Sequence, residues 1–168
     1  KNLLKYSFAA ISAFMVVLLI FIKPIMLHGE QSRYRDKIIF SEKTKYQKIV
    51  ITQWKSHYWL YLNGHVQFSS YDEERYHEPL VHPAMLLSPS PKNVIILGGG
   101  DGLAAREVLK HKEVKSITVV DLDPAMTDIA KTHPAFRKIN EESMNNPKVH
   151  IINQDAYKFL QESKDLYD

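Results

Sequence analysis

The sequence predicts an α/β protein in three parts: an N-terminal transmembrane helix, a small β-hairpin subdomain, and the first half of a doubly wound parallel sheet. Three observations predict this. The segment Tyr6–Ile22 carries no charged residue. The dipeptide Asn63-Gly64 stands between two β-type runs and is a strong hairpin signal. Branched apolar residues at 94–97 lead directly into a glycine-rich turn, as in a buried parallel strand.

The N-terminal apolar segment is flanked by Lys5 and Lys23. At about 1.5 Å per residue it nearly crosses a ~30 Å hydrocarbon layer, and the lysines can reach its edges. A secretory signal peptide is the main alternative, but no small-x-small cleavage site follows. A buried helix of a soluble protein is a weaker alternative, because no face is polar beyond two serines. We assign residues 1–28 to the transmembrane helix and its flank.

Residues 29–43 are expected to be a linker. They and the residues just after them are rich in basic side chains, at positions 33, 35, 37, 43 and 45. By the positive-inside rule this favours a cytoplasmic exit, although Lys1 and Lys5 on the other side make the asymmetry only suggestive. The expected location is therefore the cell membrane, with the domain that follows the helix on its cytoplasmic side.

Residues 44–71 are predicted to form the β subdomain. Its β-type runs are Tyr46–Ile51, Tyr58–Leu62 and Val66–Phe68. Ser70–Glu73 then has the pattern of a capping box that begins a helix. Pro79 should end or kink this helix.

Residues 72–168 are predicted to form a nucleoside-binding domain that is incomplete at its C-terminus. The glycines follow G-x-G-x-G (Gly98, Gly100, Gly102), whereas a dinucleotide fingerprint would need glycine where Leu103 stands. This order resembles the loop of class I S-adenosylmethionine-type enzymes, which are Rossmann-like. Asp101 inside the loop would repel a pyrophosphate and attract a cationic group.

The turn should lie at the N-terminus of a helix over 103–110, where free N–H groups favour electron-rich ligand atoms. Polar groups also follow the next two predicted strands. Ile117–Val120 leads into Asp121, and Val149–Asn153 is followed by Asp155. The carboxyl ends of parallel strands share one sheet edge, where open α/β sheets bind ligands. Asp121 is placed to accept both hydroxyls of a ribose, and Asp155 can accept from an adenine amino group.

Composition excludes several classes of site and partner. The chain has no cysteine, so disulfides and thiolate metal sites are excluded. The spacing of His, Asp and Glu gives no metal cluster, and there is no serine-triad context. The net charge of +3 is too small to indicate nucleic acid. We expect His82 to be a surface or packing residue, and the charges of 107–115 to form a solvated helix face.

Several motifs occur together in one order: Tyr46-Gln47, Asn63-Gly64-x-x-Gln67, Asp72-Glu73-x-x-Tyr76-His77-Glu78, and Gly98-Gly99-Gly100-Asp101-Gly102. Over residues 44–168 this order resembles the polyamine aminopropyltransferase family, the spermidine synthases. Thr132-His133-Pro134 and 153–155 are similar to its membrane-fused bacterial branch.

The resemblance implies decarboxylated S-adenosylmethionine as co-substrate, putrescine or a similar polyamine as acceptor, and neither cofactor nor metal. It implies a nucleoside-binding set of Gln47, Gly98, Gly99, Gly100, Asp121, Asp155 and Ala156. His77 and Asp101 would hold amino groups, with Gln67 and Tyr76 as pocket walls. Two departures from the family are Asp121 in place of glutamate, which shortens its reach, and Asn63 in place of aspartate.

In the family, the catalytic Asp lies beyond residue 168, and Asp168 resembles a structural acid. We therefore expect a fragment cut at both ends, and a homo-oligomer is compatible with the β subdomain. A methyltransferase that uses intact S-adenosylmethionine is one alternative, against which Asp101 and the Tyr-His-Glu helix argue. A non-enzymatic, membrane-tethered module that binds nucleoside or polyamine is the other, and only the downstream half would discriminate it.

Overall fold

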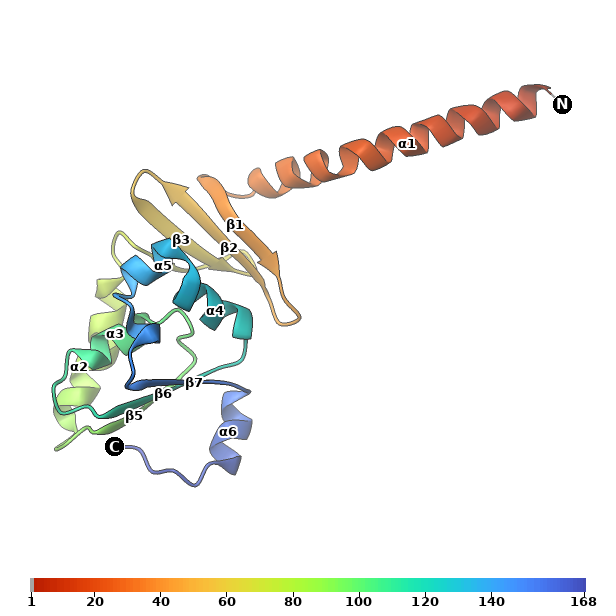
Figure 1. The fold of residues 1–168 in the computed structure, drawn as a ribbon. Helices are drawn as coiled ribbons and strands as arrows, with labels where there is room; N and C mark the ends of the chain where they lie inside the picture. Colours follow the sequence, from red (N-terminus) through yellow and green to blue (C-terminus); the bar gives the residue numbers. More distant parts are fainter. Residues whose placement is uncertain (1) are drawn as a thin grey trace. The chain divides into compact units, whose positions relative to one another are not determined.

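The structure is a computed structural model that describes residues 2–168 (Figure 1). The chain divides into two compact units, one up to Ile38 and one over Ile39–Asp168. The helices are α1 (Asn2–Gln31), α2 (Glu74–Leu87), α3 (Leu103–Leu109), α4 (Pro124–Thr132), α5 (Pro134–Ile139) and α6 (Ala156–Glu162). The strands are β1 (Lys37–Lys43), β2 (Lys48–Trp54), β3 (His57–Leu62), β4 (His65–Ser69), β5 (Asn93–Leu97), β6 (Ser116–Asp121) and β7 (Val149–Asn153).

The first unit is dominated by α1, which confirms the predicted apolar helix. The helix does not stop at Lys23-Pro24 but continues through Pro24 to Gln31. Its part Lys5–Gln31 is long and apolar enough to cross a membrane. Large apolar side chains such as Phe14 and Leu19 are more than 60% exposed, and a soluble helix normally buries such a surface.

Four antiparallel strands in the order β1-β2-β3-β4 form the first sheet. Strands β2 and β3 pair from Ile49↔Leu62 to Trp54↔His57. The predicted hairpin at Asn63-Gly64 is confirmed, because both residues have positive φ (52° and 84°) between β3 and β4. This is the two-residue geometry that matches the twist of antiparallel strands.

The linker expected over 29–43 is wrong for its second half, where β1 extends this sheet. The strand has only a short apolar run, Ile38–Phe40, and ends in charged residues. It lies at the sheet edge, where short, charged strands are usual because they discourage pairing with other chains. Alternation is weak in such a strand, so the sequence pattern missed it.

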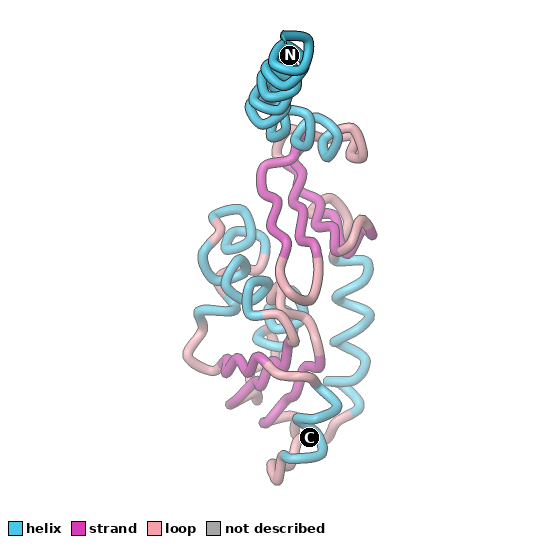
Figure 2. The backbone as a smooth tube through the Cα atoms, turned by 90° about the vertical axis from the view of Figure 1, so that its right-hand side faces the viewer, coloured by secondary structure: helices cyan, strands magenta, loops and turns pink. Residues whose placement is uncertain are grey.

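Three parallel strands in the order β5-β6-β7 form the second sheet. They pair in even register, from Val94↔Ile117 to Leu97↔Val120 and from Ile117↔Val149 to Asp121↔Asn153. Each predicted strand is present, and the turn after β5 leads into α3. Figures 1 and 2 show this sheet and the antiparallel sheet as separate layers of strands. The predicted Rossmann-like α/β class is confirmed.

One core joins the two layers of residues 39–168. Ile49, Ile51 and Leu60 of the antiparallel sheet are fully buried in the same apolar cluster as Leu103 of α3 and Val119 of β6. At roughly 25 cal/mol per Å² of apolar area, burial of this set provides the main drive for the layers to associate.

Helix α2 differs from two predictions. The capping box is wrong: the helix begins at Glu74, and Glu73 precedes it with no side-chain cap. The hydroxyl of Ser70 instead accepts a hydrogen bond from the backbone N–H of Tyr58. Pro79 does not end the helix, which continues to Leu87.

Candidate active site at the strand tips

The glycine turn after β5 is shaped by close contacts that exclude side chains. The N–H of Gly100 donates to Oδ2 of Asp121 at 2.8 Å. A Cβ at Gly100 would lie 2.6 Å from that same oxygen. Gly102 has φ +86°, and a Cβ there would lie 2.5 Å from Cγ of Met144. Only glycine therefore fits the turn at these two positions.

Asp121 ends β6 and ties neighbouring loops to it. Its Oδ1 accepts from the N–H of Asp123 at 3.0 Å, while Oδ2 accepts from Gly100. Its backbone oxygen accepts from the N–H of Gln154 at 3.1 Å, after β7. On the other side, the N–H of Gly98 donates to the oxygen of Val120 at 2.8 Å. The three strand tips are thus hydrogen-bonded to one another, and a carboxylate still has further lone pairs for a ligand.

Asp123 links the antiparallel sheet to α4. Its Oδ1 accepts from the N–H of Ala125, as an N-cap. Its Oδ2 accepts from Nε2 of Gln47 at 3.0 Å and from the hydroxyl of Thr44 at 2.8 Å. This holds the β1–β2 turn, and the side chain of Gln47, beside the strand tips.

A cavity of about 420 Å³ lies at these tips. Its polar lining includes the carboxylates Asp101, Asp121, Asp123 and Asp155, and the apolar part includes Leu60, Leu62, Val120, Leu122 and Met126. None of the lining residues is Lys, Arg or His. Four carboxylates that the lining itself does not neutralise favour a cationic ligand.

The structure gathers most of the predicted site residues around this cavity. The lining includes Gln47, Gln67, Gly98, Gly99, Gly100, Asp101, Asp121, Asp155 and Ala156. Asp155 is exposed, and its Oδ1 caps α6 by accepting from the N–H of Lys158 at 2.9 Å. The binding roles of these residues stay predictions.

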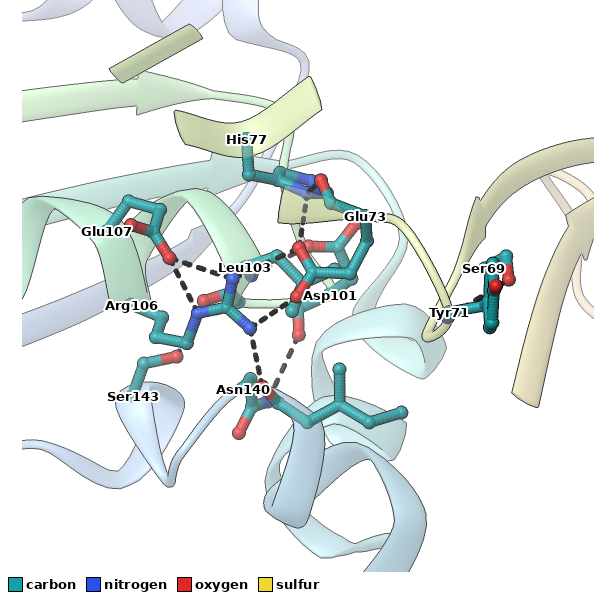
Figure 3. Close-up of polar contacts among 12 residues, drawn as sticks. Ser69, Tyr71, Glu73, His77, Asp101, Leu103, Arg106, Glu107, Asn140 and Ser143 are labelled. Carbon is teal, nitrogen blue, oxygen red and sulfur yellow. Dashed lines mark hydrogen bonds and ion pairs between the residues drawn. The ribbon is translucent and has the colours of Figure 1, made fainter. Parts of the chain in front are cut away.

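Two predicted residues lie outside the lining. Tyr76 is 63% exposed on α2. His77 is buried, and its Nδ1 lies 2.9 Å from both the backbone oxygen and Oε2 of Glu73. His77 is nevertheless grouped with Glu73 and Asp101 in the close-up of the site (Figure 3).

Burial raises the pKa of Asp101 above its ordinary value. The hydrogen bond from the N–H of Leu103, at 2.9 Å, acts in the opposite direction but does not outweigh burial. Because burial disfavours the ionised form of Asp101, a bound ammonium would stabilise that form by supplying a nearby opposite charge.

A buried charge cluster, Glu73, His77, Arg106 and Glu107, joins α2 to α3 (Figure 3). Arg106 donates from Nη1 to Oε1 of Glu73 at 2.6 Å and from Nη2 to Oε2 at 3.0 Å. It also donates from Nε to Oε1 of Glu107 at 2.8 Å. These contacts form a bidentate ion pair with one carboxylate and a second pair with the other.

The expectation of a solvated face is wrong for Glu107, whose side chain is fully buried. Burial alone would raise its pKa, but hydrogen bonds from Lys110 and Arg106 lower the pKa below its ordinary value. Its Oε2 also lies 3.0 Å from Nε2 of His82, which is a packing residue, as expected. The helical period alone could not show that α2 covers this face of α3.

Sequence reasoning missed Asp123 and the apolar lining. Asp123 could have been found, because an Asp before a proline is a strong N-cap signal. Leu122 and Met126 carry no chemical signal of their own, and only the fold brings them to the cavity.

Comparison with known proteins gives the family of this site. Residues 73–168, which contain the glycine turn and all three parallel strands, match the family model described as the spermine/spermidine synthase domain. The chain belongs to the spermine/spermidine synthase family. Among curated relatives, a polyamine aminopropyltransferase from Leptospira interrogans is 56% identical over 144 residues, which cover 86% of this chain and 29% of the relative. A polyamine aminopropyltransferase from Oceanobacillus iheyensis is 47% identical over 158 residues, covering 94% and 31%.

Solved structures agree with this membership. The crystal structure of spermidine synthase from Thermotoga maritima superposes with a TM-score of 0.73 at 29% identity, covering 79% of this chain and 45% of that one. A spermidine synthase in complex with the transition-state analogue AdoDATO has the same TM-score and identity, covering 79% and 46%. The chain thus spans about 30% of the length of the curated relatives and under half of the solved ones.

Proposed function

We propose that this chain is the nucleoside-binding part of a polyamine aminopropyltransferase. The reaction would transfer the aminopropyl group of decarboxylated S-adenosylmethionine to putrescine, giving spermidine and methylthioadenosine. The observation that carries the proposal is the strand-tip cavity, whose lining holds four carboxylates and no basic side chain. Both proposed substrates are cationic. Membership of the family and the relatives named polyamine aminopropyltransferase support the same reaction.

The chemistry would be an in-line displacement. An amine nitrogen of putrescine attacks the carbon next to the sulfonium, the C–S bond breaks, and the nitrogen loses a proton as the C–N bond forms. Since the sulfide is a good leaving group, the protein mainly has to position the two substrates. The Gly98–Gly100 turn and Asp121 would hold the nucleoside, with Asp155 and Ala156 at the adenine. Asp101 would hold an amino group, and the proton acceptor is expected beyond residue 168.

Activity of the full-length protein tests the proposal. With putrescine and decarboxylated S-adenosylmethionine, we expect spermidine and methylthioadenosine in equal amounts, measured by chromatography. We expect the rate to be unchanged by a chelator, because the proposal includes no metal or cofactor. Failure to form spermidine, together with methyl transfer from intact S-adenosylmethionine, would replace the proposal by the methyltransferase alternative.

We also propose that α1 spans the cell membrane and that the second unit lies on its cytoplasmic side. The length of the apolar segment and the basic residues after it support this orientation. These 168 residues have no cysteine, so replacing the exposed Lys112 introduces a reactive site whose labelling is measured against that of the unsubstituted protein. We expect Lys112→Cys to react with an impermeant maleimide only after cells are permeabilised.

A homo-oligomer through the antiparallel sheet completes the proposal. Val66 on the edge strand β4 and Trp54 at the end of β2 are each more than half exposed, which leaves apolar surface for a second copy. We expect Val66→Glu to reduce the mass of the full-length protein in light scattering to that of the monomer.

A further inference from the structure

The hydrogen-bond partners of His77 determine which ring nitrogen carries the proton. Nδ1 lies 2.9 Å from the backbone oxygen of Glu73 and 2.9 Å from its Oε2. A backbone oxygen and an ionised carboxylate can only accept, so Nδ1 must be the donor. In the neutral ring, Nε2 is then the nitrogen with the free lone pair.

Arg106 holds the carboxylate of Glu73 in place. The two side chains are 7% and 2% exposed, and they form two ion-pair contacts, at 2.6 and 3.0 Å. The remaining donors of the guanidinium are used by Glu107 and by the backbone oxygen of Ile139. A guanidinium with every donor direction occupied holds the carboxylate in one orientation.

The ring of His77 is itself confined. The rings of Tyr76 and Phe68 meet it edge to face, with centroids 5.0 and 6.5 Å away. His77, Glu73 and Asp101 are grouped together, while Ser69 and Tyr71 lie to one side (Figure 3). Asp101 lines the strand-tip cavity, so the histidine lies next to the part of the lining where the proposed function places the amine.

We propose that Glu73 and Arg106 are positioning residues that hold His77 as the Nδ1–H tautomer, so that its Nε2 accepts a hydrogen bond from the amine substrate. This proposal rests on the proposed function. In it, Asp101 supplies the negative charge for the amine, and His77 supplies a directed, neutral acceptor. The hydrogen bond that one ring nitrogen of a histidine makes sets which nitrogen carries the proton, and so which one can accept.

The chain offers a matched pair of variants. Glu73→Gln and Glu107→Gln each remove one buried carboxylate charge from the same guanidinium. Only Glu73 touches His77. The amide in Glu73→Gln has a single oxygen, for which Arg106 competes, so the Nδ1–H keeps the backbone oxygen of residue 73 as acceptor but loses the carboxylate, and the preference for a proton on Nδ1 should weaken.

The test combines nitrogen NMR of histidine-labelled full-length protein with steady-state kinetics. In the wild type, we expect the proton of His77 on Nδ1 and a shift of the Nε2 resonance when putrescine is added. Glu73→Gln should populate both tautomers and raise the KM for putrescine about tenfold, the factor equivalent to about 1.4 kcal/mol. The kcat and the KM for the nucleoside should change less than about twofold. Glu107→Gln should leave the tautomer and the putrescine KM as in the wild type.

Three results would overturn the inference alone in an enzyme that makes spermidine: a proton on Nε2, an Nε2 resonance insensitive to putrescine, or equal effects of the two variants. Absence of spermidine from the wild-type reaction would overturn the proposed function, and with it the role of an amine at Nε2. The tautomer is measured without turnover, so the two failures are distinguishable.

Discussion

The strand-tip cavity and the buried charge cluster both gather carboxylates, but only one of them balances the charge internally. The cavity lining holds Asp101, Asp121, Asp123 and Asp155, whose carboxylates accept hydrogen bonds from backbone N–H groups and neutral side chains. In the cluster, Arg106 lies between Glu73 and Glu107, and Lys110 and His82 also contact Glu107. His77 of the cluster and Asp101 of the lining are grouped together where the two regions meet (Figure 3).

This difference indicates that the cavity binds a ligand and that the buried cluster holds the helices in position. Negative charge that the protein leaves uncompensated in an open cavity is costly without a ligand, and such sites tend to be functional. Negative charge that is paired inside the protein fixes the positions of the elements that carry it. Here, the paired carboxylates join α2 to α3, and the unpaired ones face the space where a ligand would lie. The following variants test the two sides of this comparison, and the last one changes a carboxylate that lies outside both regions.

The largest effect is expected from Arg106→Met. It leaves Glu73 and Glu107 buried without their main cation, and breaking a buried pair in this way costs about 3–5 kcal/mol. The measurement is the free energy of unfolding of the full-length protein. Arg137→Met is the control, because Arg137 and Glu142 form a pair in which both side chains are about half exposed; it should change little. Equal losses in the two variants would contradict the distinction.

Asp101→Asn should weaken amine binding by about 1.5–3 kcal/mol, the range for a hydrogen bond to a charged group. Asn can still accept from the N–H of Leu103, so the turn is retained.

The same variant tests stability. Burial raises the folded-state pKa of Asp101, so the contribution of this group to the free energy of unfolding is present below pH 3.8 and is lost as the pH rises through the folded pKa. The variant should therefore be slightly more stable than the wild type at pH 7. The putrescine KM and the thermal midpoint check both expectations.

A control within the same cavity is Asp155→Asn. Asparagine caps a helix as well as aspartate, so α6 should be kept. The putrescine KM should stay at the wild-type value if Asp155 faces the adenine. A loss of amine affinity as large as that of Asp101→Asn would show that the cavity acts through total charge only.

Gly100→Ala places a Cβ 2.6 Å from Oδ2 of Asp121. One of them must move, and overpacking of this kind typically costs about 1–3 kcal/mol. We expect nucleoside affinity, measured by calorimetry with methylthioadenosine, to fall by that amount while putrescine binding changes less. Gly29→Ala is a control, since nothing lies within 4 Å of a Cβ there. Unchanged nucleoside affinity in Gly100→Ala would remove Asp121 from the site.

The smallest effect is expected from Asp168→Asn, where the carboxylate belongs to neither region. Its Oδ2 accepts from the N–H groups of Lys92 and Asn93 at 2.8 Å each, and these bonds hold its pKa below the ordinary value. The contribution of Asp168 to the free energy of unfolding is therefore present above pH 3.8 and is lost as the pH falls through the lower folded-state pKa. The variant should show a slightly smaller drop in thermal midpoint between pH 7 and pH 3. An identical drop would mean that these bonds do not stabilise the folded chain.

The predictable part of the fold rests on strong local signals. The strand over 149–153 and the hairpin at Asn63-Gly64 follow from short-range patterns that few other structures satisfy. Edge strand β1 and the course of α2 through Pro79 were not predictable in the same way. Both depend on packing against partners far along the chain, and such partners override local propensity.

The sequence by itself determined the parallel strands, the glycine turn and the acidic residues at the strand ends, because these follow from the period and spacing of neighbouring residues. Only the tertiary structure decided that Glu73 and Glu107, 34 positions apart along the chain, share one buried guanidinium. It also brought Gln47 to Asp123. The physical reason is that a charge's role depends on which opposite charges and how much water lie within a few ångströms, and folding, not spacing along the chain, sets those neighbours.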